Sequence, residues 1–294
     1  MKRKSKSDKI FDFINYIFMA IILFLVAYPI YFVVIASFSD PTYVNSGQVL
    51  LFPKGITFEG YKMILEFKQI WTGYKNSIIY TFFGTCLNIA VLIPSSFALS
   101  RKELVGRKFF TTLCVFAMYF SGGTIPLYLL VKNLGLFNTI WSLILPMAFG
   151  IYNMIICRSF FIGNVSEELY ESVKIDGGGY MRFFFSIVVP LSKAIIAVMV
   201  LYNALAHWNS YLTVLYYIRD ESKYNLQLIL KNISSVLNTQ QMEGMSMEAM
   251  ISAEKVKELV KYTTILIAAL PMIILYPFVQ KYFVTGVMIG SVKG

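Results

Sequence analysis

The chain has 294 residues, of which 57% are hydrophobic and 14% charged, and its formal net charge is +10. A soluble domain carries about 25% charged residues, so this composition excludes an ordinary water-soluble enzyme or binding domain. An excess of Lys and Arg on an apolar chain is typical of the cytoplasmic side of a membrane protein. We therefore expect contact with membrane lipid and no nucleic-acid partner.

Six windows of the sequence contain no Asp, Glu, Lys or Arg. Each is longer than the roughly 17 residues that a helix needs to cross the hydrocarbon core of a bilayer. We therefore predict an all-α membrane protein with six transmembrane helices, at approximately 13–39, 76–100, 109–131, 134–157, 191–217 and 262–280. The predicted layout comprises a cytoplasmic N-terminus (1–12), a membrane domain (13–284) and a cytoplasmic tail (285–294).

The distribution of Lys and Arg predicts which ends of the spans face the cytoplasm. With the N-terminus inside, 15 of the 26 basic residues fall on the cytoplasmic side. Four of them lie in the short loop 101–108, whereas the facing outer turn holds only Lys132. Because cytoplasmic loops carry the excess of positive charge, we expect both termini in the cytoplasm.

The sequence lacks the patterns of nucleotide, metal and nucleophile sites. No G-x-x-x-x-G-K-[ST] motif that would cradle phosphates occurs. The three cysteines lie far apart in apolar windows, so they indicate packing and neither a disulfide framework nor a metal site. The single histidine, His207, lies in a predicted span, which argues against a Ser–His–Asp arrangement. We therefore expect no bound cofactor or metal and no catalysis by this chain.

A polar segment, 164–190, separates the fourth and fifth predicted spans. Its first half has apolar residues four positions apart, which lie on one face of an α-helix, and Asn164 is suited to cap that helix. The run Gly177–Gly179 would stop the helix, because glycine accepts the left-handed conformation of a sharp reversal. An amphipathic helix whose apolar stripe is left uncovered would dock in a groove of a partner, whereas the alternative is an ordinary interfacial loop with glycine turns. The stripe consists of Val165, Leu169 and Val173.

Polar residues inside the third and fifth predicted spans are candidates to line a path for substrate. The sequence from Ser121 to Pro126 breaks the third span, and broken backbone is tolerated at membrane depth only where protein or a water-filled cavity satisfies it. Polar side chains in the fifth span should face the interior of the helix bundle. His207 has the alternative role of a hydrogen-bonded residue within the bundle. The candidate path residues are Ser121, Thr124, Asn203, His207, Trp208 and Asn209.

The polar segment contains four residues at the spacing of a known motif: Glu171, Gly177, Ile187 and Pro190. Their spacing resembles the EAA loop of the membrane subunits of binding-protein-dependent ABC importers. Ser172 and Val173 stand where that motif has alanines. Further segments are similar to the second membrane subunit of maltose-type sugar importers, in the branch for complex oligosaccharides, and they are 51–53, 58–61, 208–211 and 286–294.

The resemblance implies the fold of a type I ABC importer permease with cytoplasmic coupling helices. The loop 164–190 would sit in a cleft of an ATPase subunit, and the external segment 219–261 would enter the binding protein. The C-terminal tail would reach the ATPase dimer through Gly290, Lys293 and Gly294. The implied ATPase-coupling residues are Glu168, Glu171, Ser172, Val173, Asp176, Gly177, Gly178 and Pro190.

The resemblance also implies the composition of the assembly. The chain would pair with a second homologous permease subunit, two ATPase subunits and an extracytoplasmic solute-binding protein, in the cytoplasmic membrane of a bacterium. ATP and Mg would bind to the partner ATPase, so this chain would be a non-catalytic membrane subunit. Its cargo would be a sugar, in particular an oligosaccharide.

Three other functions stay open at this point. An ion-coupled secondary transporter would place ionisable residues inside its spans, whereas the predicted spans hold only His207 and, at the end of the fifth, Lys193. A membrane-embedded enzyme would show clustered acid–base residues or metal ligands. An ABC permease for amino acids or peptides is the nearest alternative within the family.

Overall fold

The computed structural model describes residues 5–239 and 247–290 of the chain, and within these residues every regular element is a helix. Three helices are long and apolar enough to cross a membrane, and three bent pairs of helices pass the same test together. Counting each bent pair as one span gives up to six spans, the number predicted from the sequence. The single helices cover Ser7–Ser37, Lys68–Ser100 and Ser252–Phe278, and the bent pairs are Arg107–Tyr119 with Thr124–Asn133, Trp141–Met147 with Ile151–Asn164, and Tyr180–Leu191 with Lys193–Trp208.

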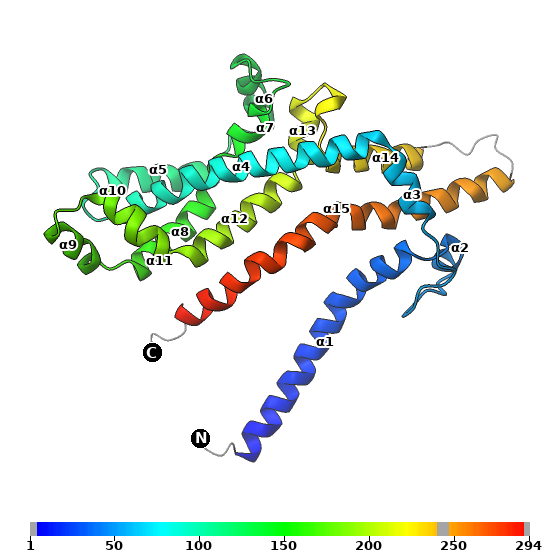
Figure 1. Ribbon diagram of the computed structural model, residues 1–294, viewed down its shortest axis with the longest axis horizontal. Coiled ribbons are helices and arrows are strands. Elements are labelled where there is room, and N and C mark those ends of the chain that lie inside the picture. Colours follow the sequence, from blue (N-terminus) through cyan, green and yellow to red (C-terminus); the bar gives the residue numbers. More distant parts are fainter. Residues whose placement is uncertain (1–4, 240–246, 291–294) are drawn as a thin grey trace. The chain divides into compact units, whose positions relative to one another are not determined.

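The chain divides into two compact units, the first of which combines residues 1–68 with 230–270. Asp40 caps α2, because its Oδ1 accepts the backbone N–H of Thr42 at 2.8 Å. Gly60 lets α3 approach α15 closely, since a Cβ at this position would lie 2.6 Å from Thr263 Oγ1. The helices of this unit are α1 (Lys6–Ser37), α2 (Pro41–Asn45), α3 (Glu59–Glu66) and parts of α14 (Leu226–Thr239) and α15 (Met247–Gly290) (Figure 1).

The second unit, residues 69–229 and 271–294, carries the polar segment singled out in the sequence. Its α-helices are α4 (Lys68–Ser100), α5 (Arg107–Tyr119), α6 (Thr124–Asn133), α7 (Trp141–Ile144), α8 (Ile151–Asn164), α9 (Glu167–Ile175), α10 (Tyr180–Phe183), α11 (Val189–Leu191), α12 (Lys193–Trp208) and α13 (Tyr211–Tyr217). Three short helices of other types join them: η1 (Leu145–Met147), η2 (Phe184–Val188) and η3 (Glu221–Lys223). In Figure 1, α9, α10 and α11 lie together at the end of α4 and α8.

An aromatic cluster forms the core at that end of the second unit. Phe97 of α4 packs against Phe161 of α8 with ring centroids 6.0 Å apart. The same ring lies 5.9 Å from Phe183 of α10 and 5.2 Å from Phe184. Aromatic pairs at such distances add about 0.5–1.5 kcal/mol beyond the area that they bury. The cluster therefore ties α4, α8 and the polar segment into one body.

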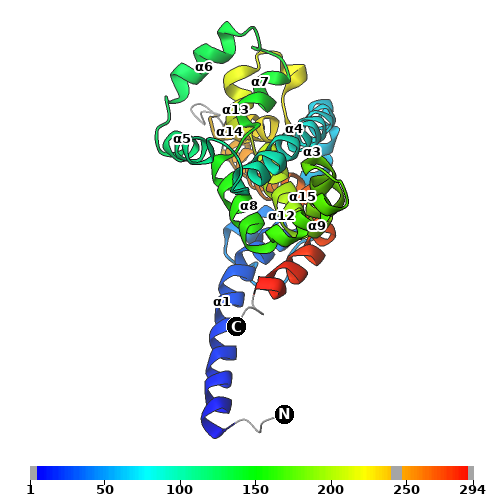
Figure 2. The same cartoon turned by 90° about the vertical axis from the view of Figure 1, so that its left-hand side faces the viewer.

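Breaks inside the predicted spans have identifiable causes. α5 and α6 meet at 113°, and Figure 2 shows α6 turning away from α5. Gly123 at this break has a φ of +90°, a conformation that favours glycine, so the interruption predicted from Ser121 to Pro126 is present. Two further bends fall within the predicted spans 134–157 and 191–217, by 47° before α8 and by 79° before α12. These two spans, predicted as single helices, are each built from shorter helices.

Two helices are longer than the predicted spans. α4 begins at Lys68, well before residue 76. α15 includes the end of the predicted external segment, 219–261, and the predicted tail is helical as far as Gly290. The physical reason is that an apolar window marks only the part of a helix that matches the bilayer. The backbone hydrogen bonds of the helix continue until a stop signal ends them.

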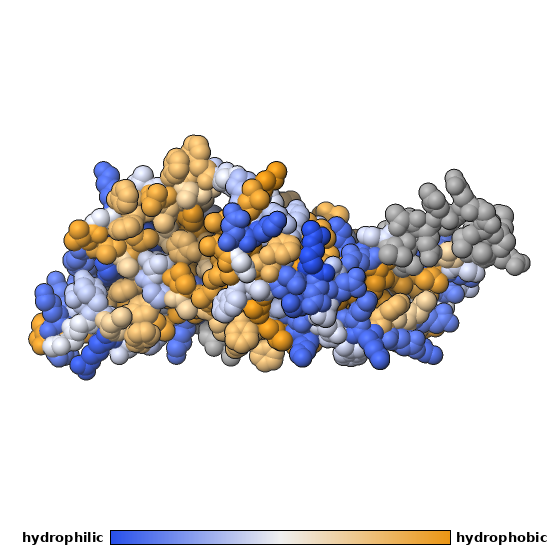
Figure 3. Space-filling view, turned by 90° about the horizontal axis from the view of Figure 1, so that it is seen from above, coloured by the Kyte–Doolittle hydropathy of each residue, from blue (hydrophilic) through white to orange (hydrophobic). Residues whose placement is uncertain are grey.

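The surface of the described residues is rich in apolar side chains. Figure 3 shows hydrophobic residues spread over much of the face that it presents. Exposed large apolar residues occur on long helices, for example Phe24 on α1, Phe82 on α4 and Ile274 on α15. Such a surface is unfavourable in water and is typical of helices that contact lipid or another membrane subunit. The chain is a multi-pass membrane protein.

We expect Phe161→Ala to lower the free energy of unfolding by about 3–5 kcal/mol, because it removes a fully buried ring and leaves a cavity. The thermal unfolding midpoint of the purified chain in detergent measures the effect. Ile162→Ala is the matched control, since Ile162 is the next residue of α8 and is 52% exposed. An equal loss of stability in both variants would contradict the placement of the core.

Candidate functional site

The polar segment folds into a helical hairpin, residues 166–191, which we call the polar hairpin. α9 forms its first arm, and α10, η2 and α11 form its second arm. The reversal lies at Gly177, whose φ of +73° is rarely adopted by other residues. The N–H groups of Gly177 and Gly178 donate to the carbonyls of Lys174 at 3.0 Å and Val173 at 2.8 Å, which closes the end of α9. The predicted amphipathic helix and its glycine stop are present.

The apolar stripe of the polar hairpin is covered by the chain itself. Val165 is 3% exposed and Val173 is 9% exposed, and both belong to the core cluster that contains Phe97 and Phe183. Leu169 packs on the same cluster. The prediction that this stripe is left uncovered for a partner is therefore wrong, because the hairpin folds back onto the ends of α4 and α8.

The start of α9 also differs from the prediction. Asn164 is the last residue of α8, and its Nδ2 donates to the carbonyl of Phe160 at 2.9 Å. Ser166 is the N-cap residue of α9, although its hydroxyl makes no capping hydrogen bond. Glu167 and Glu168 lie in the first turn, where the positive end of the helix dipole stabilises them. Asn164 therefore does not cap this helix.

The outward face of the polar hairpin combines carboxylates with large apolar side chains. Ile175 is 87% exposed and Met181 is 75% exposed. Among the residues implied by the family motif, Val173 is buried and Gly178 is half-buried. The exposed ones are Glu168, Glu171, Ser172, Asp176, Gly177 and Pro190.

The second arm contains a π-helical turn, η2, immediately before Pro190. Proline has no N–H to donate, and its ring clashes with the carbonyl four residues earlier, so a regular α-helical ladder cannot continue through it. Beyond it, the N–H of Ser192 is shared between the carbonyls of Val188 at 3.0 Å and Val189 at 3.2 Å. The chain then bends by 79° into α12. Pro190 thus lies where the angle between the hairpin and α12 is set.

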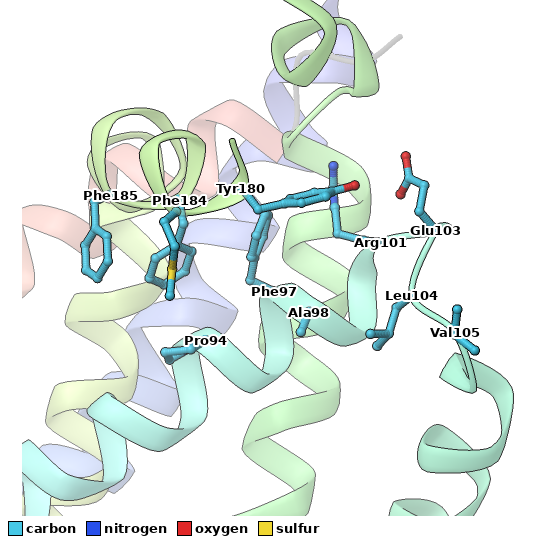
Figure 4. A pocket seen from close by; sticks show the side chains of 11 residues that line it. Pro94, Phe97, Ala98, Arg101, Glu103, Leu104, Val105, Tyr180, Phe184 and Phe185 are labelled. Atoms are coloured by element: carbon cyan, nitrogen blue, oxygen red, sulfur yellow. The ribbon is translucent and has the colours of Figure 1, made fainter. Parts of the chain in front are cut away.

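An apolar pocket of about 560 Å³ lies between the end of α4, the loop that follows it and the second arm of the hairpin (Figure 4). Tyr180 at its edge stacks on Tyr170, with ring centroids 4.2 Å apart. The lining is mostly apolar, with Pro94, Phe97, Leu104 and Phe184 among its residues. Its polar groups, from Arg101, Glu103 and Tyr180, belong to the end of α4, the loop after it and the start of α10.

The buried polar residues of α12 have partners within the protein. His207 is 3% exposed, and its Nε2 lies 3.0 Å from Nδ2 of Asn88 on α4. Asn203 donates from Nδ2 to the carbonyl of Met199 in its own helix at 2.8 Å. Trp208 is 2% exposed and follows His207 at the end of α12. The structure thus gives His207 a hydrogen-bonding role between two helices.

Gly84 brings α4 and α12 together at this pair. A Cβ at Gly84 would lie 2.5 Å from the His207 ring. Asn88 also donates from Nδ2 toward the carbonyl of Gly84 at 3.2 Å. Its Oδ1 is buried and has no hydrogen-bond partner in the described part of the chain. A buried acceptor of this kind is costly unless a further group satisfies it, so the pair retains capacity for one more hydrogen bond.

The other candidate path residues lie elsewhere. Asn209 is exposed beyond α12, and its Oδ1 accepts from Gln227 Nε2 at 3.4 Å. Ser121 and Thr124 are exposed at the break between α5 and α6, and over residues 5–239 and 247–290 neither is hydrogen-bonded to the α12 group. The six candidates therefore do not form one cluster. Of the predicted tail contacts, Gly290 ends α15, while Lys293 and Gly294 lie outside the described residues.

Sequence reasoning missed the partner of His207. Asn88 is an asparagine in an otherwise apolar span, which is itself a signal of contact between membrane helices. The pairing could not be inferred, because 119 positions separate the two residues. Among the described residues, no group of three or more His, Cys, Asp or Glu side chains is arranged to hold a metal ion.

Individual relatives identify the family, although no family model matches the chain. The chain is 36% identical over 287 residues to the polygalacturonan/rhamnogalacturonan transport system permease protein YtcP of Bacillus subtilis (strain 168). This alignment covers 98% of this chain and 99% of the relative. It is 35% identical over 290 residues to Protein LplC of the same strain, covering 99% of this chain and 97% of that one. A crystal structure of a bacterial ABC transporter involved in the import of the acidic polysaccharide alginate contains a similar chain. The TM-score is 0.80 at 31% identity, and the match covers 96% of this chain and 100% of that chain.

The bent membrane spans and the polar hairpin define the class of protein as a multi-pass helical membrane protein. Together with these relatives, they show that the chain belongs to the family of permease subunits of carbohydrate ABC importers. The resemblance inferred from the spacing of Glu171, Gly177 and Pro190 is confirmed.

We expect Asn88→Ala to lower the free energy of unfolding by about 1–3 kcal/mol, because it removes the buried side-chain hydrogen bond between Asn88 and His207. Thermal unfolding of the purified chain in detergent measures this loss. Ser95→Ala is the matched control, since the hydrogen bonds of the Ser95 hydroxyl within the described residues go to carbonyls of its own helix. Equal midpoints for Asn88→Ala and the unmodified chain would show that the pair does not stabilise the fold.

Proposed function

We propose that the chain is one of two membrane subunits of an ABC sugar importer and that its polar hairpin receives the motion of an ATPase subunit. The observation that carries this proposal is the division of the hairpin into two faces. Val173 is 9% exposed and anchored in the core, whereas Ile175 is 87% exposed. Glu168 and Glu171 are exposed beside it. To transmit motion, the hairpin must have one part that is packed on the membrane domain and another that is free to contact a partner. Val173 belongs to the first part and Ile175 to the second.

The proposal requires the polar hairpin to lie in the cytoplasm. The loop 101–108, which follows α4, contains four basic residues, as expected of a cytoplasmic loop. Lys102 Nζ of this loop forms an ion pair with Glu167 of α9 at 3.0 Å, so the loop and the hairpin lie on the same side of the membrane. With six spans, both termini would then also be cytoplasmic.

The outward face suits a cleft that is apolar at its centre and basic at its rim. Ile175 and Met181 would fill the apolar part, because exposed side chains of this size gain most from burial at an interface. Carboxylates such as Glu168 and Glu171 would pair with basic residues around it and fix the orientation. The buried stripe residues would position the hairpin without touching the ATPase.

ATP and Mg would bind to the partner ATPase subunits, since this chain has no phosphate-binding motif. Closure of the ATPase pair would shift the hairpin, and α12 would follow because it is joined to the second arm through Pro190 and Ser192. The path would then open on one side of the membrane as it shuts on the other. Such a shift requires that the ATPase states contact the hairpin differently.

We propose an oligosaccharide that contains uronic acids as the cargo, delivered by an extracytoplasmic solute-binding protein. The support comes from the relatives. YtcP is named for polygalacturonan and rhamnogalacturonan, and the similar crystal structure belongs to an importer of an acidic polysaccharide. The external segment 219–261 would meet the binding protein.

We expect Gly177→Asp to uncouple ATP hydrolysis from uptake. Its φ of +73° strains any other residue by about 1–2 kcal/mol, and the new carboxylate would stand on the face that the ATPase grips. In proteoliposomes with the complete transporter, uptake of a fluorescent trigalacturonide should fall by about tenfold while ATP hydrolysis persists. Gly163→Asp adds the same charge to α8, where a Cβ meets nothing within 4 Å, and should leave uptake unchanged. Unaltered uptake in Gly177→Asp would remove the coupling assignment.

The cargo class has its own test. The cognate binding protein should bind trigalacturonide in titration calorimetry, with no heat from maltotriose of the same length. Binding of maltotriose alone would contradict the uronic acid assignment and would leave the role of the polar hairpin unaffected.

A further inference from the structure

Two arginines connect α4 and α8 at the base of the polar hairpin. Arg101 follows the last residue of α4, and its Nη2 donates to the carbonyl of Val165, the C-cap residue that follows α8, at 3.2 Å. Arg158 lies on α8, and its Nε donates to the carbonyl of Leu99 in the last turn of α4 at 3.0 Å. Each arginine therefore binds a carbonyl at the end of the other arginine's helix.

The position of these bonds has a physical reason. The last four carbonyls of an α-helix have no partner within the helix, and the negative end of the helix dipole lies there. A guanidinium group at this end satisfies a free acceptor and compensates the dipole, and hydrogen bonds from charged donors are stronger than neutral ones. The two arginines thus hold the ends of α4 and α8 against each other from both sides.

Arg101 is an unusual residue for a merely structural role. It is 7% exposed, and among the described residues no carboxylate lies within ion-pair distance of it. Its guanidinium lies over the ring of Phe97 at 5.2 Å, and its Nε donates to Ser100 Oγ at 3.2 Å. Figure 4 shows it beside Tyr180 at the wall of the apolar pocket. Burying a charge without a counter-charge is costly, so an apolar residue would serve packing better.

The bonded carbonyl lies where the first arm of the hairpin begins. Val165 directly precedes Ser166, the N-cap of α9. From Arg101, α4 leads back to Asn88, which contacts His207 on α12. α12 is in turn joined to the second arm through Pro190. Both arms of the hairpin are thus connected to the same polar pair, one through the arginines and α4 and the other through α12.

We propose that Arg101 and Arg158 form a clamp that makes α4 move together with the polar hairpin. They are positioning residues, because they act through α4 and α9 and touch neither the ATPase nor the cargo. The inference rests on the proposed function of the hairpin and names the residues through which it reaches α4. Without the clamp, the aromatic cluster around Phe97 would still hold α4 to the hairpin, but the helix ends at Leu99 and Val165 would lose their charged hydrogen bonds. The ATPase would then move α12 fully and α4 incompletely, so the two sides of the path would no longer move together.

The nearby ion pair between Lys102 and Glu167 does not have this role. The two side chains are 73% and 51% exposed, and ion pairs in such positions contribute little. Lys102→Gln therefore serves as a control that removes a contact between the same loop and the hairpin. Lys108→Gln removes a charge from an exposed residue of α5 and controls for the net charge of the loop.

The test uses the complete transporter in proteoliposomes with trigalacturonide as the probe. Arg101→Met and Arg158→Met should each lower uptake per ATP hydrolysed by about tenfold. The thermal unfolding midpoint of the complex should change little for Arg101→Met, because removal of a buried charge offsets the loss of the hydrogen bond to the Val165 carbonyl. A merely structural role would give the opposite pattern, a lower midpoint with an unchanged ratio. Lys102→Gln and Lys108→Gln should keep the ratio of the unmodified protein.

A second readout needs no transported sugar. The cognate binding protein should stimulate ATP hydrolysis in the unmodified transporter, and the Met variants should lose most of this stimulation. If the Met variants do not assemble, the same two readouts are measured on Arg101→Lys and Arg158→Lys. Lysine keeps the charge but lacks the planar fork of donors, so about a threefold loss of the same ratio is expected. Unmodified values of both readouts in the assembled variants would overturn the clamp.

The outcomes separate this inference from the proposed function. If Gly177→Asp uncouples transport while both Met variants keep unmodified values, the clamp is wrong and the coupling role of the hairpin stands. If Gly177→Asp leaves uptake unaltered, the proposed function itself fails.

Discussion

The packing of the polar hairpin against Phe97 and Phe161 is the contact on which the functional end of this protein depends. It buries Val173 and Phe183 from the two arms in one aromatic core. Because that core also contains the ends of α4 and α8, the hairpin is part of the membrane body. The core holds the acidic and apolar outer face of the hairpin in one orientation. A partner must bind this face before it can move the hairpin.

Some polar contacts of the described residues join helices that are distant in sequence. Asn88 and His207 link α4 to α12 where Gly84 allows the closest approach. At the end of α4, Arg101 and Arg158 bind backbone carbonyls at buried and half-buried positions. In such surroundings an unsatisfied polar group is expensive, so these contacts specify how the helices are placed as well as how firmly they are held.

Much of the architecture could be predicted from local sequence. The uncharged windows gave the six spans, since a helix that crosses a bilayer must bury every backbone group within itself. The Ser121–Pro126 break and the stop at Gly177 were predictable because glycine and proline act on their own backbone. The family followed from a few residues of one loop. The bends before α8 and α12 and the length of α15 were not predicted, because hydropathy measures the match to lipid and not the continuity of a helix.

The sequence by itself determined that this is a helical membrane protein with a polar segment, interrupted by glycines, between its fourth and fifth spans. Only the tertiary structure decided which face of that segment is free. The stripe of Val165 and Val173 has the periodicity of a docking surface, and periodicity shows that residues share a face without showing what covers it. The structure also decided the roles of Arg101 and Arg158, which in the sequence are only two of the basic residues on the inner side. Their carbonyl partners are 64 and 59 positions away, and a contact over that distance exists only once the helices are packed.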